Sequence, residues 1–273
     1  MIERVVAMYF SPTNTTKKVV EEIAGGLASD LGCVQETVDF TLPGVREEIQ
    51  AFGPRDLVVF GTPVYAGRVP NVLLKYIHTV QGGGALAVPI VLFGNRNYDD
   101  ALAELQALLG EDGFLPVAAG AFVGEHSFSR ILGAGRPDDK DMVVIHEFVK
   151  KIYEKISSTG ERESYQPLNV GGEYPSKGYY QPRDRQGNPV DIRKVKPKTS
   201  EACDDCKFCA KVCPMGSISY DDVREFTGIC IKCGSCIKKC PTGAKYYDAE
   251  SYLYHQHELE EEYTRRAEPS LFI

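Results

Sequence analysis

The chain has 273 residues, 43% of them hydrophobic and 25% charged, which is enough for one large or two modest globular domains. Its 31 basic and 38 acidic residues give a formal net charge of -7, and this balance argues against a nucleic-acid-binding surface. No run of about 18 apolar residues occurs, so no membrane span is expected.

The first 158 residues alternate short apolar runs with amphipathic ones. Several apolar runs have no polar face, as is typical of strands buried in a parallel sheet. Strands are predicted at residues 4–10, 34–40, 56–63, 88–94 and 115–124. Helices are predicted at about residues 14–31, 70–80, 98–110 and 141–157. This regular alternation predicts a parallel α/β sheet in a domain of residues 1–158.

A loop rich in hydroxyl side chains follows the first predicted strand and opens the first helix. Backbone N–H groups at a helix N-terminus have no intrahelical partners, and the helix dipole favours an anion there. The alternative is that one of these side chains only caps the helix. Because the loop has more polar side chains than a cap needs, we predict a phosphate site. Its candidate residues are Ser11, Thr13, Asn14, Thr15 and Thr16.

Weaker candidates lie elsewhere in the first domain. His126 follows the fifth strand, where a histidine would suit proton donation to a bound molecule; a structural loop histidine is the alternative. Predicted loops at the same end of the sheet contain Arg68, Arg96 and Arg130, which would attract an anion or form surface salt bridges. Cys33 is interpreted as a small buried hydrophobe.

Other nucleotide-binding motifs are absent or out of context. Gly82, Gly84 and Ala87 match G-x-G-x-x-A, but they follow a helix and precede a strand, the reverse of a dinucleotide fingerprint. No G-x-x-x-x-G-K-[ST] occurs, which argues against an ATPase.

Residues 159–200 break the alternation and are rich in Gly, Pro, Tyr and charge, so they are predicted to form a linker. Flexible linkers seldom contain many aromatic residues. We therefore expect this linker to lie along the first domain, because it contains Tyr165, Tyr174, Tyr179 and Tyr180.

Eight of the nine cysteines form two copies of C-x2-C-x2-C-x3-C-P, in residues 203–214 and 230–241. This is an iron–sulfur ligand spacing; zinc, the competing metal, usually takes two separated pairs. A domain of residues 201–248 would build little core, so metal centres would stabilise it.

The opening residues lack the features of a signal peptide, so we expect a reducing, cytoplasmic location rather than a disulfide framework.

The last segment, residues 249–273, is predicted to be an acidic tail with a short helix. Its charge run is interpreted as a solvated face, with a docking site as the alternative.

The two cysteine runs resemble those of bacterial ferredoxins that hold two [4Fe-4S] clusters. In that family the fourth cysteine of each run binds the other cluster. The resemblance implies one ligand set made of Cys203, Cys206, Cys209 and Cys240. It implies a second set made of Cys230, Cys233, Cys236 and Cys213.

The hydroxyl-rich loop resembles the phosphate loop of flavodoxins, and two later segments extend the likeness. Residues 61–70 look like the loop that packs an aromatic ring on the flavin, and residues 94–101 look like the loop on its other side. The chain has no tryptophan, so a tyrosine is expected in its place; Tyr65 and Tyr98 are candidates, with anchoring of the loops as the alternative. The resemblance implies FMN as cofactor. Further implied contacts are Pro63, Val64, Tyr65, Gly67, Gly94, Asn95, Asn97 and Tyr98.

Together the two halves resemble the flavodoxin–ferredoxin fusion proteins, or flavoferredoxins, of anaerobic bacteria and archaea. The resemblance implies a flavodoxin-like, doubly wound, five-stranded parallel sheet followed by a small α+β bacterial 2[4Fe-4S] ferredoxin domain. It implies an electron-transfer protein that relays electrons between two [4Fe-4S] clusters and FMN, coupling one- and two-electron redox partners. The expected partners are low-potential donor and acceptor proteins, and a homo-oligomer is left open.

Two alternatives stand beside this hypothesis. The first is an FMN-dependent reductase whose clusters feed electrons to a flavin-bound small substrate such as a quinone, a flavin or oxygen. The second is an iron–sulfur sensor or interaction module.

Overall fold

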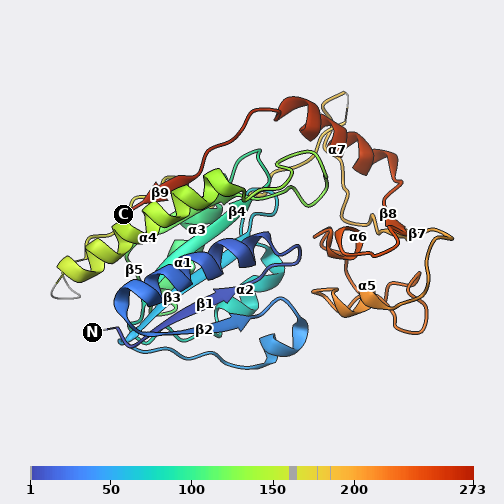
Figure 1. Cartoon of the computed structure of the whole chain (residues 1–273). Coiled ribbons are helices and arrows are strands. Elements are labelled where there is room, and N and C mark those ends of the chain that lie inside the picture. Colours follow the sequence, from blue (N-terminus) through green and yellow to red (C-terminus); the bar gives the residue numbers. More distant parts are fainter. Residues whose placement is uncertain (1, 160–164, 177, 185) are drawn as a thin grey trace.

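The computed structural model describes residues 2–159, 165–176, 178–184 and 186–273 (Figure 1). Part of the predicted linker therefore lies outside the described residues. The strands are β1 (Arg4–Tyr9), β2 (Val34–Asp39), β3 (Asp56–Pro63), β4 (Leu86–Phe93), β5 (Leu115–Pro116), β6 (Ala119–Val123), β7 (Lys198–Thr199), β8 (Lys245–Tyr246) and β9 (Ser270–Phe272). The α-helices are α1 (Thr15–Leu31), α2 (Asn71–Ile77), α3 (Ala101–Glu111), α4 (Asp139–Ser158), α5 (Phe208–Lys211), α6 (Ser235–Lys238) and α7 (Glu250–Glu262), with a 3-10 helix η1 (Pro43–Glu47).

The main sheet has the strand order β2-β1-β3-β4-β6-β9, and β5 pairs with β4. Every pair from β2 to β6 is parallel. The chain moves outward from β1 to β2 and then reverses to add β3 on the other side of β1. Ligands of doubly wound sheets bind at the carboxyl ends of the strands beside such a reversal.

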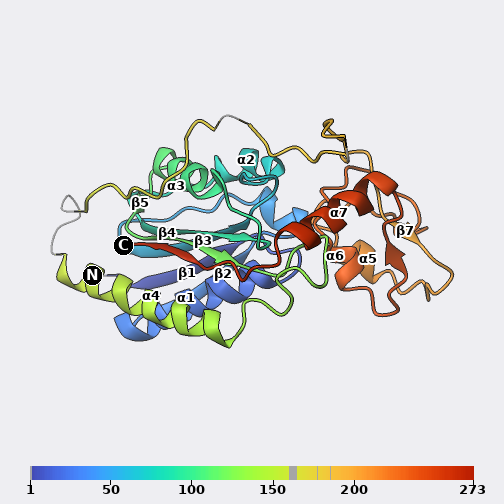
Figure 2. The same ribbon diagram turned by 90° about the horizontal axis from the view of Figure 1, so that it is seen from above.

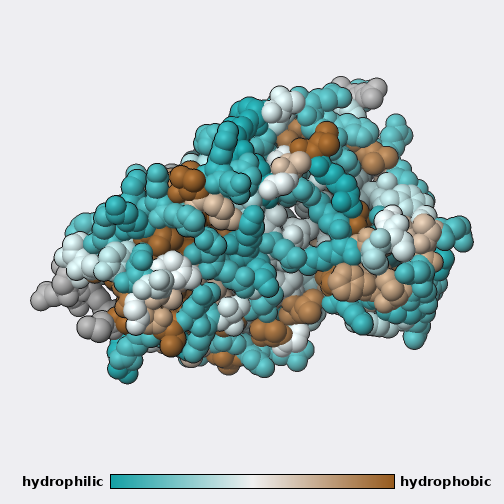
Figure 3. All heavy atoms as spheres, in the orientation of Figure 1, coloured by the Kyte–Doolittle hydropathy of each residue, from teal (hydrophilic) through white to brown (hydrophobic). Residues whose placement is uncertain are grey.

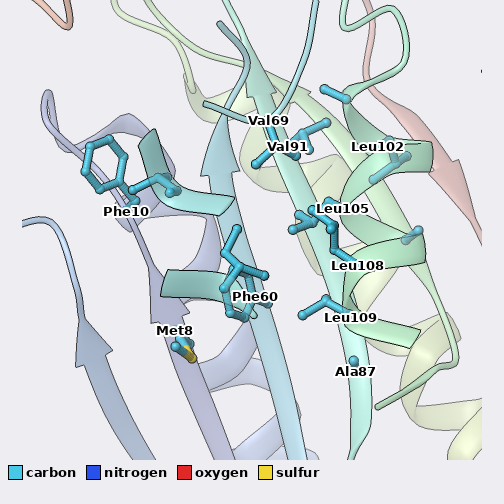
Figure 4. Packing of buried hydrophobic residues seen from close by; sticks show 14 of the residues in the cluster. Met8, Phe10, Phe60, Val69, Ala87, Val91, Leu102, Leu105, Leu108 and Leu109 are labelled. Atoms are coloured by element: carbon cyan, nitrogen blue, oxygen red, sulfur yellow. The ribbon is translucent and has the colours of Figure 1, made fainter. Parts of the chain in front are cut away.

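Helices cover both faces of the sheet: α1 and α4 lie on one face, and α2 and α3 on the other (Figure 2). Each face carries one hydrophobic cluster. In Figure 4 the leucines of α3, among them Leu105 and Leu109, lie against the β3 and β4 side of the sheet. Because both faces are buried, β4 carries no exposed residue, which explains its continuous apolar sequence.

The predicted helices are all present, with ends set by local chemistry. Gly32 follows α1 in the left-handed conformation that ends many helices. Asp138 and Asp141 form a capping box at the start of α4. The helix predicted from residue 98 begins at Ala101, because Asp99 has a positive φ of 44° that no helix accommodates.

Two differences from the predicted sheet concern its edge. The fifth predicted strand is divided into β5 and β6. Beyond it, β9 from the end of the chain pairs antiparallel with β6, placing Leu271 opposite Gly120. This added strand covers the β6 edge, so the predicted acidic tail contributes a strand to the first sheet. We refer to residues 2–159 with β9 as the sheet domain.

Residues 198–246 form a smaller unit, here called the cysteine domain, closed by the antiparallel pair β7–β8. Its two cysteine runs repeat one backbone pattern: Asp205 and Lys207 in the first run, and Lys232 and Gly234 in the second, all have φ between 54° and 74°. These left-handed residues wind each run tightly before α5 or α6 begins. In both views α6 lies nearer the sheet domain than α5 does (Figures 1 and 2).

Both connections of the cysteine domain lie along the sheet domain. On the linker side, Leu168 and Val170 pack on the core beside α3, and the Tyr180 N–H donates to Ala66 O. On the tail side, α7 leads to β9. Within the described ranges, no helix has the length and apolar character needed to cross a membrane.

Candidate functional site

A cavity opens at the carboxyl ends of the parallel strands, and we call it the strand-end cavity. It contains about 440 Å3 of empty space and is partly open to solvent. Figure 3 shows the surface hollowed between the two domains. The cavity is lined by Pro12, Thr13, Thr15, Thr16, Pro63, Val64, Tyr65, Leu92, Phe93, Gly94, Gly124, Glu125, His126, Ser127 and Cys233.

Three residues of the predicted phosphate loop line this cavity: Thr13, Thr15 and Thr16. Thr16 lies in the first turn of α1 and is 1% exposed. Among the described residues its Oγ1 has no hydrogen-bond partner. Buried hydroxyls are normally satisfied, so this oxygen, at a helix N-terminus and beside a cavity, fits an anionic ligand such as a phosphate.

The other two loop residues have structural partners. Ser11 Oγ accepts a hydrogen bond of 2.9 Å from Lys17 N–H in the first turn of α1, which matches the helix-capping alternative. Asn14 Oδ1 accepts one of 3.1 Å from Lys239 Nζ of the cysteine domain. The structure therefore divides the predicted loop into three cavity residues and two residues that fix its shape and position.

The loop after β3 places Pro63, Val64 and Tyr65 on the cavity wall. Tyr65 and Arg68 exchange backbone hydrogen bonds of 2.9 and 3.1 Å, which close a tight turn. Gly67 lies inside that turn with φ 78° and does not line the cavity. Burial, followed by the nearby Cys233 and Cys230 thiols, raises the pKa of Tyr65 well above its usual value.

The loop after β4 contributes only Gly94 of its four predicted residues. Asn95 instead donates to Tyr263 O and Arg265 O, both at 2.7 Å, so it holds the returning tail. Asn97 Oδ1 accepts from two backbone N–H groups of its own loop. The Tyr98 ring packs on Phe93, with centroids 5.5 Å apart, which matches the anchoring alternative.

His126 also lines the strand-end cavity. Its Nδ1 accepts a hydrogen bond of 3.1 Å from Phe128 N–H. Burial, and then the Lys238 ammonium, lower its pKa to about 3, so the ring is neutral at pH 7. Because Nδ1 is an acceptor, the ring proton lies on Nε2. His126 is thus a neutral hydrogen-bond donor rather than an acid.

Gly94 permits this position of the histidine. A Cβ added to Gly94 would stand 2.2 Å from His126 Cδ2, a separation that real atoms do not tolerate. The absence of a side chain at this position therefore allows the imidazole to reach the cavity wall.

A second cavity lies within the cysteine domain, and we call it the cysteine cavity. It contains about 340 Å3 of empty space with mainly apolar walls. All four cysteines of one implied ligand set line it, and we call these the inner set: Cys213, Cys230, Cys233 and Cys236. The thiols of Cys230 and Cys213 also affect the pKa values of Cys233 and Cys236. The fourth cysteine of the first run therefore lies with the first three of the second run.

The other implied set, Cys203, Cys206, Cys209 and Cys240, is called here the outer set. Burial raises the pKa of Cys209, with the charges of Lys245, Cys203 and Cys240 also acting on it. Of the nine cysteines, all of which lie in described ranges, Cys206 is the one that is exposed. No three described His, Cys, Asp or Glu side chains converge tightly enough for a single metal ion. A cubane binds each thiolate at a different corner, so its ligands lie farther apart than those of one ion.

Lys245 lies between the two sets. Its side chain is 3% exposed, and its Nζ donates to Thr199 Oγ1 at 2.7 Å. Burial raises the pKa of Cys209 in the outer set and of Cys236 in the inner set, and the positive charge of Lys245 opposes that rise in both. A buried ammonium at this position favours thiolates in both sets.

The two cavities share one wall, because Cys233 lines both of them. Lys238, on α6, fixes this arrangement. Its Nζ donates to Glu125 Oε1, His126 O and Ser129 O of the sheet domain at 2.5, 2.6 and 2.9 Å. The first part of the loop after β6 is therefore held against the run that contains Cys233.

An aromatic group packs between the inner set and His126. Tyr247 Oη lies 3.7 Å from Cys230 Sγ, and its ring stacks on Tyr252 of α7 at 3.9 Å. Tyr252 in turn packs on Phe128, with centroids 4.7 Å apart. The acidic helix thus buries an aromatic residue beside the site as well as presenting a solvated face.

The remaining candidates are structural in this arrangement. Arg68 donates to buried Glu104 at 2.8 Å, and Arg96 pairs with Asp99 and lies 4.3 Å above the Tyr180 ring centre. Arg130 donates to Ile237 O across the domain boundary at 3.4 Å. Cys33 packs beside the core under α1, and burial raises its pKa.

Comparison with known proteins supports the assignment of the second domain. Residues 202–244 match the family model of the 4Fe-4S dicluster domain. No curated protein matches the chain significantly.

Solved structures similar to the chain include a flavodoxin from the domain Archaea (15% identity, 56% of this chain and 99% of that chain, TM-score 0.40). A flavodoxin of Bacillus cereus shares 16% identity over 56% of this chain and 99% of its own, with a TM-score of 0.38. Rubredoxin oxygen:oxidoreductase of Desulfovibrio gigas shares 15% identity over 59% of this chain and 37% of its own, with a TM-score of 0.41.

The order β2-β1-β3-β4-β6 of parallel strands is the flavodoxin-like order. The chain therefore joins a flavodoxin-like sheet domain to a 4Fe-4S dicluster domain, whose eight cysteines imply two [4Fe-4S] clusters. The predicted fold class is confirmed, and the combination indicates a redox role in electron transfer.

Proposed function

We propose that this chain relays electrons between two [4Fe-4S] clusters and FMN, coupling one-electron to two-electron redox partners in an anaerobic cytoplasm. Flavin exchanges one or two electrons, whereas each cluster exchanges one. The observation that carries the proposal is that Cys233 lines both the cysteine cavity and the strand-end cavity.

The residues present fit both kinds of cofactor. The inner set gathers four thiols around one cavity. Thr13, Thr15 and Thr16 would hold a phosphate at the α1 N-terminus, where Thr16 Oγ1 is buried and lacks a partner in the described chain. Tyr65 would pack on a flavin ring, while Gly94 leaves room for His126, which offers a neutral donor.

The test is an anaerobic stopped-flow measurement on the reconstituted protein, with flavin and cluster absorbance followed separately after rapid cluster reduction. We expect flavin reduction at a first-order rate that does not change with protein concentration, because both cofactor sites belong to one chain. Cys233→Ser should slow this phase more than Cys206→Ser, since Cys206 does not line the strand-end cavity. A rate proportional to protein concentration, or no exchange, would contradict the relay and favour the sensor alternative.

The reductase alternative has one observation in its favour, the presence of His126 on the cavity wall. If the protein is a reductase, it must turn over a small quinone, free flavin or oxygen in the steady state. The turnover rate should then fall in the His126→Asn variant. Turnover that is absent in the wild type would remove this alternative and leave the relay.

A further inference from the structure

From residue 201 onward, the cysteine domain is divided into an acidic part and a basic part. Residues 201–225 contain three basic residues, Lys207, Lys211 and Arg224. The same segment contains six acidic residues: Glu201, Asp204, Asp205, Asp221, Asp222 and Glu225. Residues 226–246 contain no acidic residue, and their basic residues are Lys232, Lys238, Lys239 and Lys245.

All four lysines of the basic part make contacts within the molecule. Lys238 and Lys239 bind the sheet domain. Lys245 is buried between the ligand sets, and Lys232 donates to Cys230 O at 2.9 Å. The charges of the basic part are therefore engaged within the molecule, two of them at the sheet domain and two inside or beside the cysteine domain.

The acidic part surrounds the exposed cysteine. Asp204, Asp205 and Cys206 are all exposed and adjacent in the chain. Lys207 brings a second segment beside them, because its Nζ donates to Asp221 O at 3.1 Å while pairing with Asp205 at 2.8 Å. Asp221 is itself exposed.

Two aromatic side chains lie within the same segments. Phe208 is 41% exposed and Tyr220 is 56% exposed. Exposed aromatic residues among charged ones are typical of the anchors of protein interfaces. The outer set thus meets solvent at Cys206, in a surface of acidic and aromatic side chains.

Resting on the relay proposed above, we infer that this face, formed by residues 204–208 and 220–221, docks a redox protein with a basic surface. One electron crosses at Cys206. The cluster of the outer set would exchange electrons with the partner, and the cluster of the inner set would exchange them with the FMN proposed for the strand-end cavity. The two clusters have different tasks, fixed by the direction in which each run faces. Complementary charge accelerates such encounters and makes the rate fall as salt rises.

The experiment uses ferricytochrome c as a basic one-electron probe. One electron passes from the fully reduced holoprotein to each ferric haem, giving ferrous haem, which is followed by its absorbance under anaerobic conditions. The test variant is Asp204→Asn, Asp205→Asn and Asp221→Asn combined. An asparagine at position 204 keeps the acceptor for Cys206 N–H, and asparagine tolerates the positive φ of residue 205.

We expect the second-order rate at low salt to fall about tenfold in the triple variant, and the difference to vanish at high salt. Glu147→Gln, at an exposed acidic residue of α4, should leave the rate unchanged. Cluster content and midpoint potentials are measured in each variant, so that an altered driving force is not mistaken for altered docking.

Equal rates in the triple variant and the wild type, with equal salt dependence, would overturn the docking face. A similar loss in Glu147→Gln would also overturn it, because the effect would then follow net charge rather than position. Failure of the relay itself has a different signature, the absence of flavin reduction inside the protein when no cytochrome is present.

Discussion

Thr16 offers the simplest test of the phosphate site at the scale of one residue. Thr16→Val keeps the volume of the side chain and removes the Oγ1 that has no partner within the described ranges. A lost hydrogen bond to a charged group costs about 1.5–3 kcal/mol. We therefore expect FMN to bind roughly ten- to a hundredfold more weakly, measured by fluorescence titration of the apoprotein.

Thr62→Val is the matched control. Thr62 Oγ1 is also buried and has no partner in the described residues, but Thr62 does not line the strand-end cavity. Its substitution should leave the FMN dissociation constant unchanged. Equal weakening by both variants would show that the effect comes from the fold of the sheet domain and would contradict a phosphate at Thr16.

His126 makes stability depend on pH in a defined direction. Its pKa falls from 6.5 to about 3 on folding, so between these values the unfolded chain binds more protons than the folded one. This contribution is fully present above pH 6.5 and is lost as the pH falls toward about 3. The wild type should lose up to about 1.4 kcal/mol per pH unit relative to His126→Asn over that interval.

Urea unfolding of both proteins at several pH values between about 4.5 and 7.5, which cover the upper part of this interval and the plateau above it, measures the effect. The quantity compared is the difference in unfolding free energy, in which acid effects on the clusters cancel. Parallel pH profiles would show that folding does not lower the pKa of His126.

Among the elements, those with strong periodicity were predictable from the sequence. The runs that form β1, β3 and β4 and the amphipathic pattern of α4 depend on local residues, and each was predicted within a few positions. The strand β9 was not, because Ser270–Phe272 is short and its pairing partner β6 lies far away in the chain. A short strand of this kind is specified by its tertiary partner.

The site was predictable to a similar extent. The cysteine spacing is a local signal, and the ferredoxin resemblance that it carries implied a set of four cysteines that line the cysteine cavity together. The roles of Asn95 and His126 are set by residues of α6 and of the returning tail, which no local pattern reveals. Of the predicted residues in the loop after β4, Gly94 lines the strand-end cavity, and the loop after β6 adds Glu125, His126 and Ser127.

Helix α6 has a function that α5 lacks, although the two occupy equivalent positions in the cysteine runs. Lys238 of α6 donates to three oxygens of the sheet domain, whereas the equivalent Lys211 of α5 is exposed. Lys238→Gln should weaken the association of the cysteine domain with the sheet domain by about 1.5–3 kcal/mol, because charged hydrogen bonds are lost. Hydrogen exchange of the loop after β6 should accelerate correspondingly.

Lys211→Gln is the control, and it should leave exchange in that loop unchanged. Unaltered protection in Lys238→Gln would mean that the remaining contacts, such as that of Arg46 with Pro214 O, hold the domains together without it.

For the whole molecule, the close approach of the two domains depends on a glycine. A Cβ at Gly234 would stand 2.5 Å from Ser127 O, so Gly234→Ala should push the cysteine domain away from the strand-end cavity. Such overpacking typically costs about 1–3 kcal/mol. We expect slower flavin reduction in the stopped-flow measurement, with both cofactors still bound.

Gly243→Ala separates this effect from backbone strain. Gly243 has a φ of 68°, close to the 74° of Gly234, but a Cβ there would meet nothing within 4 Å. The control shares the strain and lacks the clash, so its electron transfer should match the wild type. Equal slowing in both variants would contradict contact between the domains as the basis of transfer.

The cysteine domain is joined to the sheet domain at both of its ends, by the linker that packs beside α3 and by α7 with β9. A protease that cuts the linker would therefore leave one particle, whose two fragments migrate together until β9 is displaced from the sheet. Dilution does not separate the domains either, since the second connection keeps them at a high effective concentration. The electron path thus survives damage that would disconnect two domains joined by a single linker.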